Sequence, residues 1–110
     1  MKVICFDLDG VICTNTWGNY QNAKPFKKTI QKINKLYDEG YIIKIFTARF
    51  MSRNNENIEN VYKMGYEFTK FQIDSWGLKY HRLIMGKPSY DIIIDDKSID
   101  YDENWINKIF

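Results

Sequence analysis

Carboxylates stand at two places in this chain where a short apolar run ends. Asp7 and Asp9 follow the run at residues 3–6. Asp95 and Asp96 follow three consecutive isoleucines. A carboxylate at the buried end of a strand is disfavoured unless it is paired or bound to a metal. In the first pair, one side chain could attack an electrophile while the other transfers protons. The second pair would repel unless a cation lay between its members, and such oxygen ligands suit Mg²⁺.

A hydroxyl and an ammonium group supply the opposite polarity. Thr47 ends another apolar run, and Lys87 lies in the turn 86–88, where glycine and proline fix the direction of its side chain. Phosphoryl oxygens require such donors. Arg49 and Arg53 could add charge at the rim. Each residue alone has an ordinary alternative, such as a capping aspartate, a structural threonine or a solvated lysine, so the hypothesis depends on the combination.

Hydrophobic patterning predicts the elements that bring these groups together. Short apolar runs predict strands at residues 2–7, 41–47, 80–85 and 91–95. Helical spacing predicts helices at residues 25–40, 52–65 and 69–76, and a terminal helix from Asp102. This order predicts a Rossmann-like three-layer α/β/α fold with a short, mainly parallel sheet. Ligands bind at the carboxyl ends of such strands, so Asp7, Thr47 and Asp95 would meet at one edge.

A glycine is expected to divide the segment between the second and third strands into two helices. Ser52 can cap the first of them, and Gly65 can stop it. Thr69 and Gln72 then have the spacing of a capping box that starts the second.

Length, composition and charge exclude several classes of protein. The 110 residues allow a single domain, residues 1–110, and 16% aromatic residues exclude a wholly disordered chain. A net charge of +2 argues against a dedicated nucleic-acid binder. There is no apolar run of membrane-spanning length, and the apolar start meets Asp7 too early for a secretory signal, so we expect a cytoplasmic protein with no membrane partner. Cys5 and Cys13 are expected to be structural or incidental.

Taken in order, these residues resemble the four motifs of the haloacid dehalogenase-like hydrolases. The matching segments are Phe6-Asp7-Leu8-Asp9-Gly10-Val11, Phe46-Thr47-Ala48-Arg49, Lys87-Pro88 and Asp91-Ile92-Ile93-Ile94-Asp95-Asp96. The resemblance covers residues 2–97, and the order and strand context of the motifs agree with the family.

The resemblance implies a phosphatase that works through an aspartyl-phosphate. Asp7 would be the nucleophile, and Asp9 would protonate the leaving alcohol and then activate water. The implied phosphate-binding residues are Thr47 and Lys87, with Ala48 and Arg49 as further candidates. The implied Mg²⁺ ligands are Asp7, the backbone carbonyl of Asp9, Asp95, and Asp96 directly or through water. A carboxylate that attacks a phosphate dianion meets like-charge repulsion, which a cation lowers.

The family often carries a cap domain after the first motif or between the second and third. Here residues 10–45 and 50–86 are filled by the expected strands and helices, so the protein looks capless, with an open site. Open sites in this family act on large substrates or are closed by a neighbouring subunit, which makes a homo-oligomer plausible. The terminal residues expected to pack mainly on the core, or partly on another subunit, are Trp105, Ile106, Ile109 and Phe110.

Residues 76–81 and 85–91 resemble small capless members associated with capsule or other surface-polysaccharide biosynthesis. This suggests a phosphorylated sugar, or a phosphate-bearing sugar building block, as the substrate. The loop 14–20 has polar groups and aromatic faces suited to carbohydrate, with a solvated surface loop as the alternative. His81, the only histidine, is expected to serve packing or lie at the surface rather than in catalysis.

Two other functions remain open, and a third is disfavoured. A phosphatase acting on a 3′-phosphate of a nucleic-acid end would use the same motifs. A non-catalytic binding subunit of a biosynthetic complex would keep the fold without turnover. A phosphoacceptor receiver domain is disfavoured, because its accepting aspartate lies in mid-chain, whereas Asp7 and Asp9 lie at the amino terminus.

Overall fold

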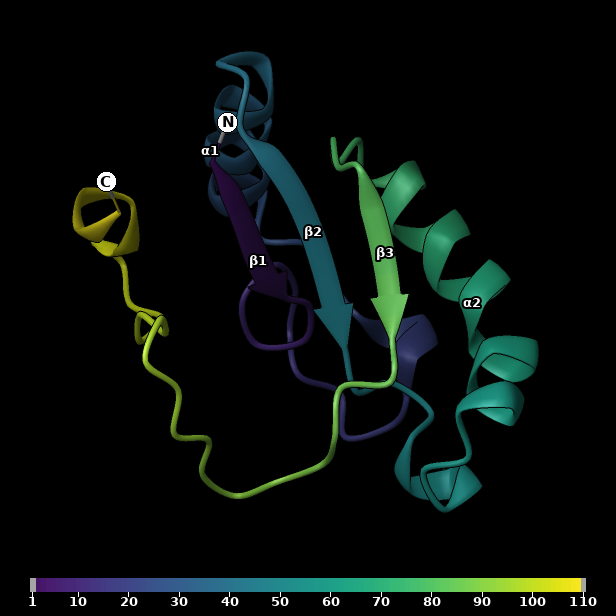
Figure 1. Cartoon of the computed structure of the whole chain (residues 1–110). Coiled ribbons are helices and arrows are strands. Elements are labelled where there is room, and N and C mark those ends of the chain that lie inside the picture. The colour runs from purple at the N-terminus through teal and green to yellow at the C-terminus, as the bar shows by residue number, and fades with distance from the viewer. Residues whose placement is uncertain (1, 110) are drawn as a thin grey trace.

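Three parallel strands form one sheet in the computed structural model of this chain, which describes residues 2–109. In the order in which they pair, the strands are β1 (Val3–Asp7), β2 (Ile42–Thr47) and β3 (Arg82–Met85). The register sets Asp7 opposite Phe46 and Thr47 opposite Met85, so all three strands end at one edge (Figure 1). The first three expected strands and their parallel order are confirmed.

Two helices flank the sheet. α1 (Lys27–Asp38) contacts β2, and α2 (Ile58–Ser75) lies alongside β3 (Figure 1). Each helix turns one stripe inward, because its buried residues recur at three- and four-residue spacing. This is a small α/β fold of the Rossmann-like kind. No helix within residues 2–109 is long and apolar enough to cross a membrane.

The core lies between the sheet and these helices. Ile33 of α1, Ile43 and Ile45 of β2, and Ile73 of α2 are fully buried. Burying such a side chain stabilises the fold by about 1.5–3 kcal/mol. Both cysteines are free thiols, with Cys13 buried and Cys5 exposed.

α2 is continuous, so the expected break at Gly65 is wrong. A Cβ atom at Gly65 would lie 2.3 Å from the ring of Phe50, which shows that this glycine serves close approach rather than helix termination. Thr69 is a buried residue within the helix and caps nothing. The helix is capped instead by Asn57, whose side chain accepts a 3.1 Å hydrogen bond from the Asn60 amide. The Ser52 cap is therefore also wrong.

The fourth expected strand is wrong as well. In the described chain, residues 91–95 join no sheet, and Ile92, Ile93 and Ile94 are 81%, 51% and 95% exposed. They belong to residues 88–104, which we call the arm. Figure 1 shows the arm leaving the end of β3, passing below the sheet and rising on the far side of β1. The apolar run fits a strand, but a strand also needs a hydrogen-bonded neighbour, and no strand within residues 2–109 pairs with this run.

The arm leads into a single 3₁₀ turn, Trp105–Lys108, which stands in place of the expected terminal helix. Trp105 is buried, with its ring centroid 5.2 Å from that of Phe6 in an edge-on contact. Ile106 and Ile109 pack against the core from partly buried positions. The expected core role is confirmed for these residues, whereas Phe110 lies outside the described part of the chain.

Candidate active site

The loop after β1 holds the first acidic pair at the carboxyl edge of the sheet. Leu8 and Ile12 are fully buried and anchor the loop, and the Ile12 amide donates a 2.9 Å hydrogen bond to the Leu8 carbonyl. Gly10 has φ +89°, a left-handed conformation that glycine adopts at low cost. The loop thereby turns sharply and keeps Asp7 and Asp9 on the same cleft.

Asp7 and Lys87 form the charged pair at the centre of the cleft. Oδ2 of Asp7 lies 3.3 Å from Nζ of Lys87, and Oδ1 accepts a 2.8 Å hydrogen bond from the Leu8 amide. The Lys87 amide donates to the Thr47 carbonyl over 3.1 Å, which ties this lysine to the end of β2. These contacts bring residues from two strand ends and the 86–88 turn into one position.

Burial and charge shift the pKa values of Asp7 and Lys87 in opposite directions. Burial raises the pKa of Asp7, although the Lys87 charge and the Leu8 amide oppose the rise. Burial alone would lower the pKa of Lys87, but interactions with Tyr90 and Asp7 outweigh it and raise that pKa. Lys87 is therefore a firmly protonated cation beside a carboxylate, an arrangement that can bind and attack an electrophile carrying anionic oxygens.

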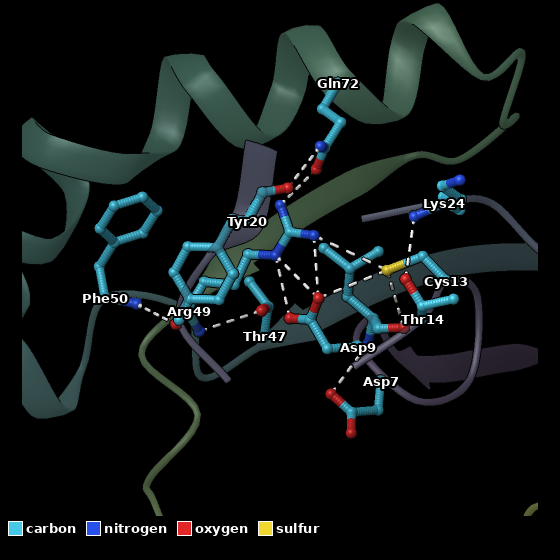
Figure 2. A network of polar contacts seen from close by, with 12 residues as sticks. Asp7, Asp9, Cys13, Thr14, Tyr20, Lys24, Thr47, Arg49, Phe50 and Gln72 are labelled. Carbon is cyan, nitrogen blue, oxygen red and sulfur yellow. Dashed lines mark hydrogen bonds and ion pairs between the residues drawn. The ribbon is translucent and has the colours of Figure 1, made fainter. Parts of the chain in front are cut away.

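Asp9 is held by a buried guanidinium. Arg49 donates from Nε to Oδ2 of Asp9 and from Nη2 to Oδ1, each over 2.9 Å, while its Nη1 donates to Gln72 over 2.6 Å (Figure 2). The Arg49 side chain is 0% exposed and its guanidinium lies 4.8 Å from the centre of the Tyr20 ring. The forked geometry orients the Asp9 carboxylate. The expected places of Arg49, at the rim or on a phosphate, do not fit this burial.

Cys13 completes the environment of Asp9. Its thiol lies 3.4 Å from Oδ1 of Asp9 and donates to it. Burial, together with the negative charge of Asp9, raises the pKa of the Cys13 thiol to about 12. The group therefore stays a protonated donor and is no nucleophile. This agrees with the expectation of a structural cysteine.

Thr47 is fully buried, and its Oγ1 accepts a 3.1 Å hydrogen bond from the Arg49 amide. The hydroxyl therefore shapes the turn after β2 and does not border the cleft in this conformation. Ala48, the other phosphate-binding candidate in this segment, does border it.

The cleft has a volume of about 700 Å³, and the loop 14–20 forms one of its walls. Trp17 is 90% exposed on this wall. Arg53 stands at the rim, where its Nη2 donates to the Gly18 carbonyl over 2.7 Å. Trp17 and Phe50 have φ values of +55° and +69°, which are strained for bulky residues and concentrate at functional sites.

The second acidic pair lies away from the first. Asp95 and Asp96 are exposed on the arm, and Asp95 Oδ1 accepts a 2.9 Å bond from the Lys97 amide. Among residues 2–109, no three histidine, cysteine or acidic side chains gather as a metal site. Asp7 and the Asp9 carbonyl alone do not make up the ligand set that the resemblance implies for Mg²⁺, so one chain in this conformation does not fit that ion.

His81 takes a structural role, as expected. Its Nδ1 accepts a 3.0 Å hydrogen bond from the Ile43 amide, and its ring stacks on Tyr37 with centroids 4.5 Å apart. Sequence reasoning missed Tyr20 and Gln72 as supports of the site. Gln72 was expected to belong to a capping box at the start of a separate helix, whereas it lies within α2 and its side chain accepts a hydrogen bond from Arg49.

No family model and no curated protein matches this chain. A similar solved structure is the crystal structure of a structural-genomics target from Vibrio cholerae, with a TM-score of 0.84 and 23% sequence identity. The similarity covers 98% of this chain and 95% of that chain. At this identity the comparison shows a shared fold over nearly the whole length, the arm included, and nothing about activity.

Proposed function

We propose that this protein is a phosphatase of the haloacid dehalogenase-like class that hydrolyses a phosphomonoester through an aspartyl-phosphate on Asp7. The single observation that carries the proposal is the Asp7–Lys87 pair, 3.3 Å apart, beside Asp9 in an open cleft at the carboxyl edge of a parallel sheet. The order of the four sequence motifs supports the same class. The finer fold assignment, a capless three-layer domain of that family, belongs to this proposal.

The chemistry divides into two steps. An Oδ atom of Asp7 attacks phosphorus, the bond to the alcohol oxygen breaks, and Asp9 is the group that delivers a proton to that oxygen. Water then attacks the phosphorus of the intermediate and gives a proton to the Asp9 carboxylate, which releases phosphate and regenerates Asp7. Lys87 offsets the negative charge that gathers on the phosphoryl oxygens. Arg49 positions Asp9 for both steps.

The family resemblance also implies Mg²⁺. One chain does not supply the implied ligand set, because Asp95 and Asp96 lie on the arm. Turnover measured with Mg²⁺ and with a chelator tests the dependence on the ion directly.

A phosphorylated sugar, or a phosphate-bearing sugar building block of surface-polysaccharide biosynthesis, is the substrate class we propose. The exposed face of Trp17 borders the cleft, and an aromatic face of this kind stacks on sugar rings. The open cleft leaves room for a substrate larger than its phosphate. The two free thiols suit a cytoplasmic setting, which is part of the same proposal.

The test is phosphate release from an aryl phosphate and then from a panel of sugar phosphates, with Mg²⁺ and with a chelator. We expect metal-dependent turnover that falls by at least about 10³-fold in Asp7→Asn. Asp38→Asn, an exposed carboxylate on α1 paired with Lys79, is the matched control and should retain full activity. Wild-type protein inactive on every compound would overturn the proposal in favour of a binding subunit. Turnover confined to DNA ends with a 3′-phosphate would show that the substrate is a nucleic acid and not a sugar phosphate.

A further inference from the structure

Two surfaces of one chain are left uncovered. β1 is an edge strand, and no described strand pairs with it on the side away from β2. Val3 and Cys5 are exposed on this strand. The three isoleucines at residues 92–94 are exposed on the arm. An open strand edge and a run of exposed isoleucines are each an association site.

The arm is tied to its own chain on both sides of these isoleucines. At its start, Ser89 Oγ lies 3.1 Å from Ser52 Oγ, and the Ser89 amide donates to Glu56. Near its end, the Tyr101 hydroxyl lies 3.1 Å from Thr29 Oγ1. Between these ties Ile92, Ile93 and Ile94 are exposed and belong to no strand. The isoleucines of this chain therefore do not pair with its own β1.

The free stretch matches the open edge in length and character. β1 spans five residues and ends in Asp7, and residues 91–95 are also five residues that end in an aspartate. Both runs are apolar in their middle. Two strands of equal length pair along their whole backbone, which would satisfy the unpaired amides and carbonyls of the β1 edge.

We propose that two copies of this chain exchange these segments. Residues 91–95 of one copy add to β1 of the second copy as a parallel fourth strand, and the second copy does the same in return. The twofold symmetry covers both open surfaces of both copies and closes the assembly at a dimer. Aligning the strand ends sets Asp95 opposite Asp7 and Ile93 opposite Cys5 across the pair of copies.

The exchange completes the acidic site in trans, a consequence that rests on the proposed function. Asp95 and Asp96 of the second copy reach the edge where Asp7 ends β1. Three carboxylates and the Asp9 carbonyl then gather from two chains, an oxygen set of the kind that Mg²⁺ takes. The site is incomplete in one chain because its second acidic pair belongs to the neighbouring one.

A cysteine cross-link tests the exchange without any assay of activity. Ile93→Cys is oxidised in solution, with wild-type Cys5 as its partner. We expect light scattering to show twice the 13.2 kDa of one chain, and a denaturing, non-reducing gel to show a disulfide-linked dimer. Adding Cys5→Ser should abolish the cross-link. Ile99→Cys, another exposed arm position, is the matched control and should not cross-link. A monomeric mass, or a disulfide formed within one chain, would overturn the exchange.

Complementation tests the shared site. Asp7→Asn and the double variant Asp95→Asn/Asp96→Asn are co-expressed with different tags, and the mixed dimer is purified through both. In the exchanged dimer one of its two sites keeps every acid, so about half of wild-type activity should return. If each site uses its own chain, the mixed dimer stays inactive, which refutes the shared site. Inactive wild-type protein would count against the proposed phosphatase, while the cross-link would still decide the exchange.

Discussion

At the scale of single residues, the protonation of Asp7 affects the stability of the fold and, in the proposed mechanism, the chemistry. Burial raises the pKa of this carboxyl above the 3.8 of an ordinary aspartate, with Lys87 as the main opposing influence. The folded protein therefore holds this proton more tightly than the unfolded chain does. The contribution is favourable at low pH, and it is lost as the pH rises through the raised pKa.

We predict that Asp7 sets the acidic limb of kcat/KM at a pH above the ordinary aspartate range. Lys87→Met should raise the pKa of Asp7 further, because it removes the nearest positive charge. Carboxyl carbon NMR titration of Asp7 checks this in both proteins without an activity assay. Asp7→Asn should also remove this contribution from the pH dependence of unfolding. An Asp7 pKa at or below 3.8 would contradict the role given to burial.

In the proposed mechanism Arg49 acts through Asp9 and is a positioning residue. Lysine keeps the charge but cannot form the forked contact or reach Gln72 at the same time. We predict that Arg49→Lys lowers kcat far more than it changes KM and lowers the free energy of unfolding by about 1–3 kcal/mol. Steady-state kinetics and urea unfolding check the two effects. Arg53→Lys, at the exposed rim, should leave stability within about 0.5 kcal/mol of wild type.

The two cysteines should differ sharply toward a thiol reagent. Cys13 is fully buried with a pKa raised to about 12, so its thiol should react only after unfolding. Cys5 is exposed in one chain and should react in the dissociated native protein, although burial raises the pKa of its thiol and slows the reaction. We predict one reactive thiol in dissociated, natively folded wild-type protein and none in Cys5→Ser. Rapid labelling of both thiols would contradict the burial of Cys13.

At the scale of elements, α2 supports the site from outside the sheet through its Gln72 side chain. Gly65 lets the Phe50 ring lie against the helix, and Gln72, two turns further on, reaches Arg49. The continuity of this helix thus links the strained turn at Phe50 to the orientation of Asp9. The local sequence around Gly65 predicts a helix end. It cannot predict a continuous helix, because the contact that requires a glycine is made by Phe50 on another segment.

We predict that Gly65→Ala destabilises the protein even though alanine favours a helix by about 1 kcal/mol over glycine. The added Cβ would lie 2.3 Å from the Phe50 ring, so the ring must move, at a cost of about 1–3 kcal/mol beyond the helical gain. Urea unfolding measures the change, with Lys63→Ala on the exposed face of α2 as the control. A net gain in stability would show that the ring moves freely.

At the scale of the whole molecule, the terminal turn decides where the arm goes. Trp105 is the arm's anchor on the core, through its contact with Phe6 of β1. We predict that Trp105→Ala lowers the free energy of unfolding by about 3–5 kcal/mol and exposes the arm to proteases. Limited proteolysis and urea unfolding check both effects. Ile94→Ala is the control, because this side chain is 95% exposed in one chain. It should leave the free energy of unfolding of the dissociated monomer unchanged.

Much of the fold follows from local patterns. Short apolar runs predicted β1, β2 and β3, because β-branched and other apolar residues fit the pleated, partly buried surface of a sheet. The glycine after α1 ended that helix as expected, with φ +100° at Gly40. The strand-end rule predicted that Asp7, Thr47 and Asp95 would meet at one edge, because parallel strands bring their carboxyl ends together. Asp7 and Thr47 do end β1 and β2 at that edge, whereas Asp95 lies on the arm.

The sequence by itself therefore determined the parallel α/β architecture and the edge on which chemistry can occur. Tertiary structure alone decided that Arg49 holds Asp9, that Gly65 lies inside a helix, and that residues 91–95 stay off the sheet. The physical reason is common to the three. Periodicity and capping act within a few residues, whereas an ion pair, a ring against a helix and a strand pairing each require a partner that is distant along the chain or on another copy of it.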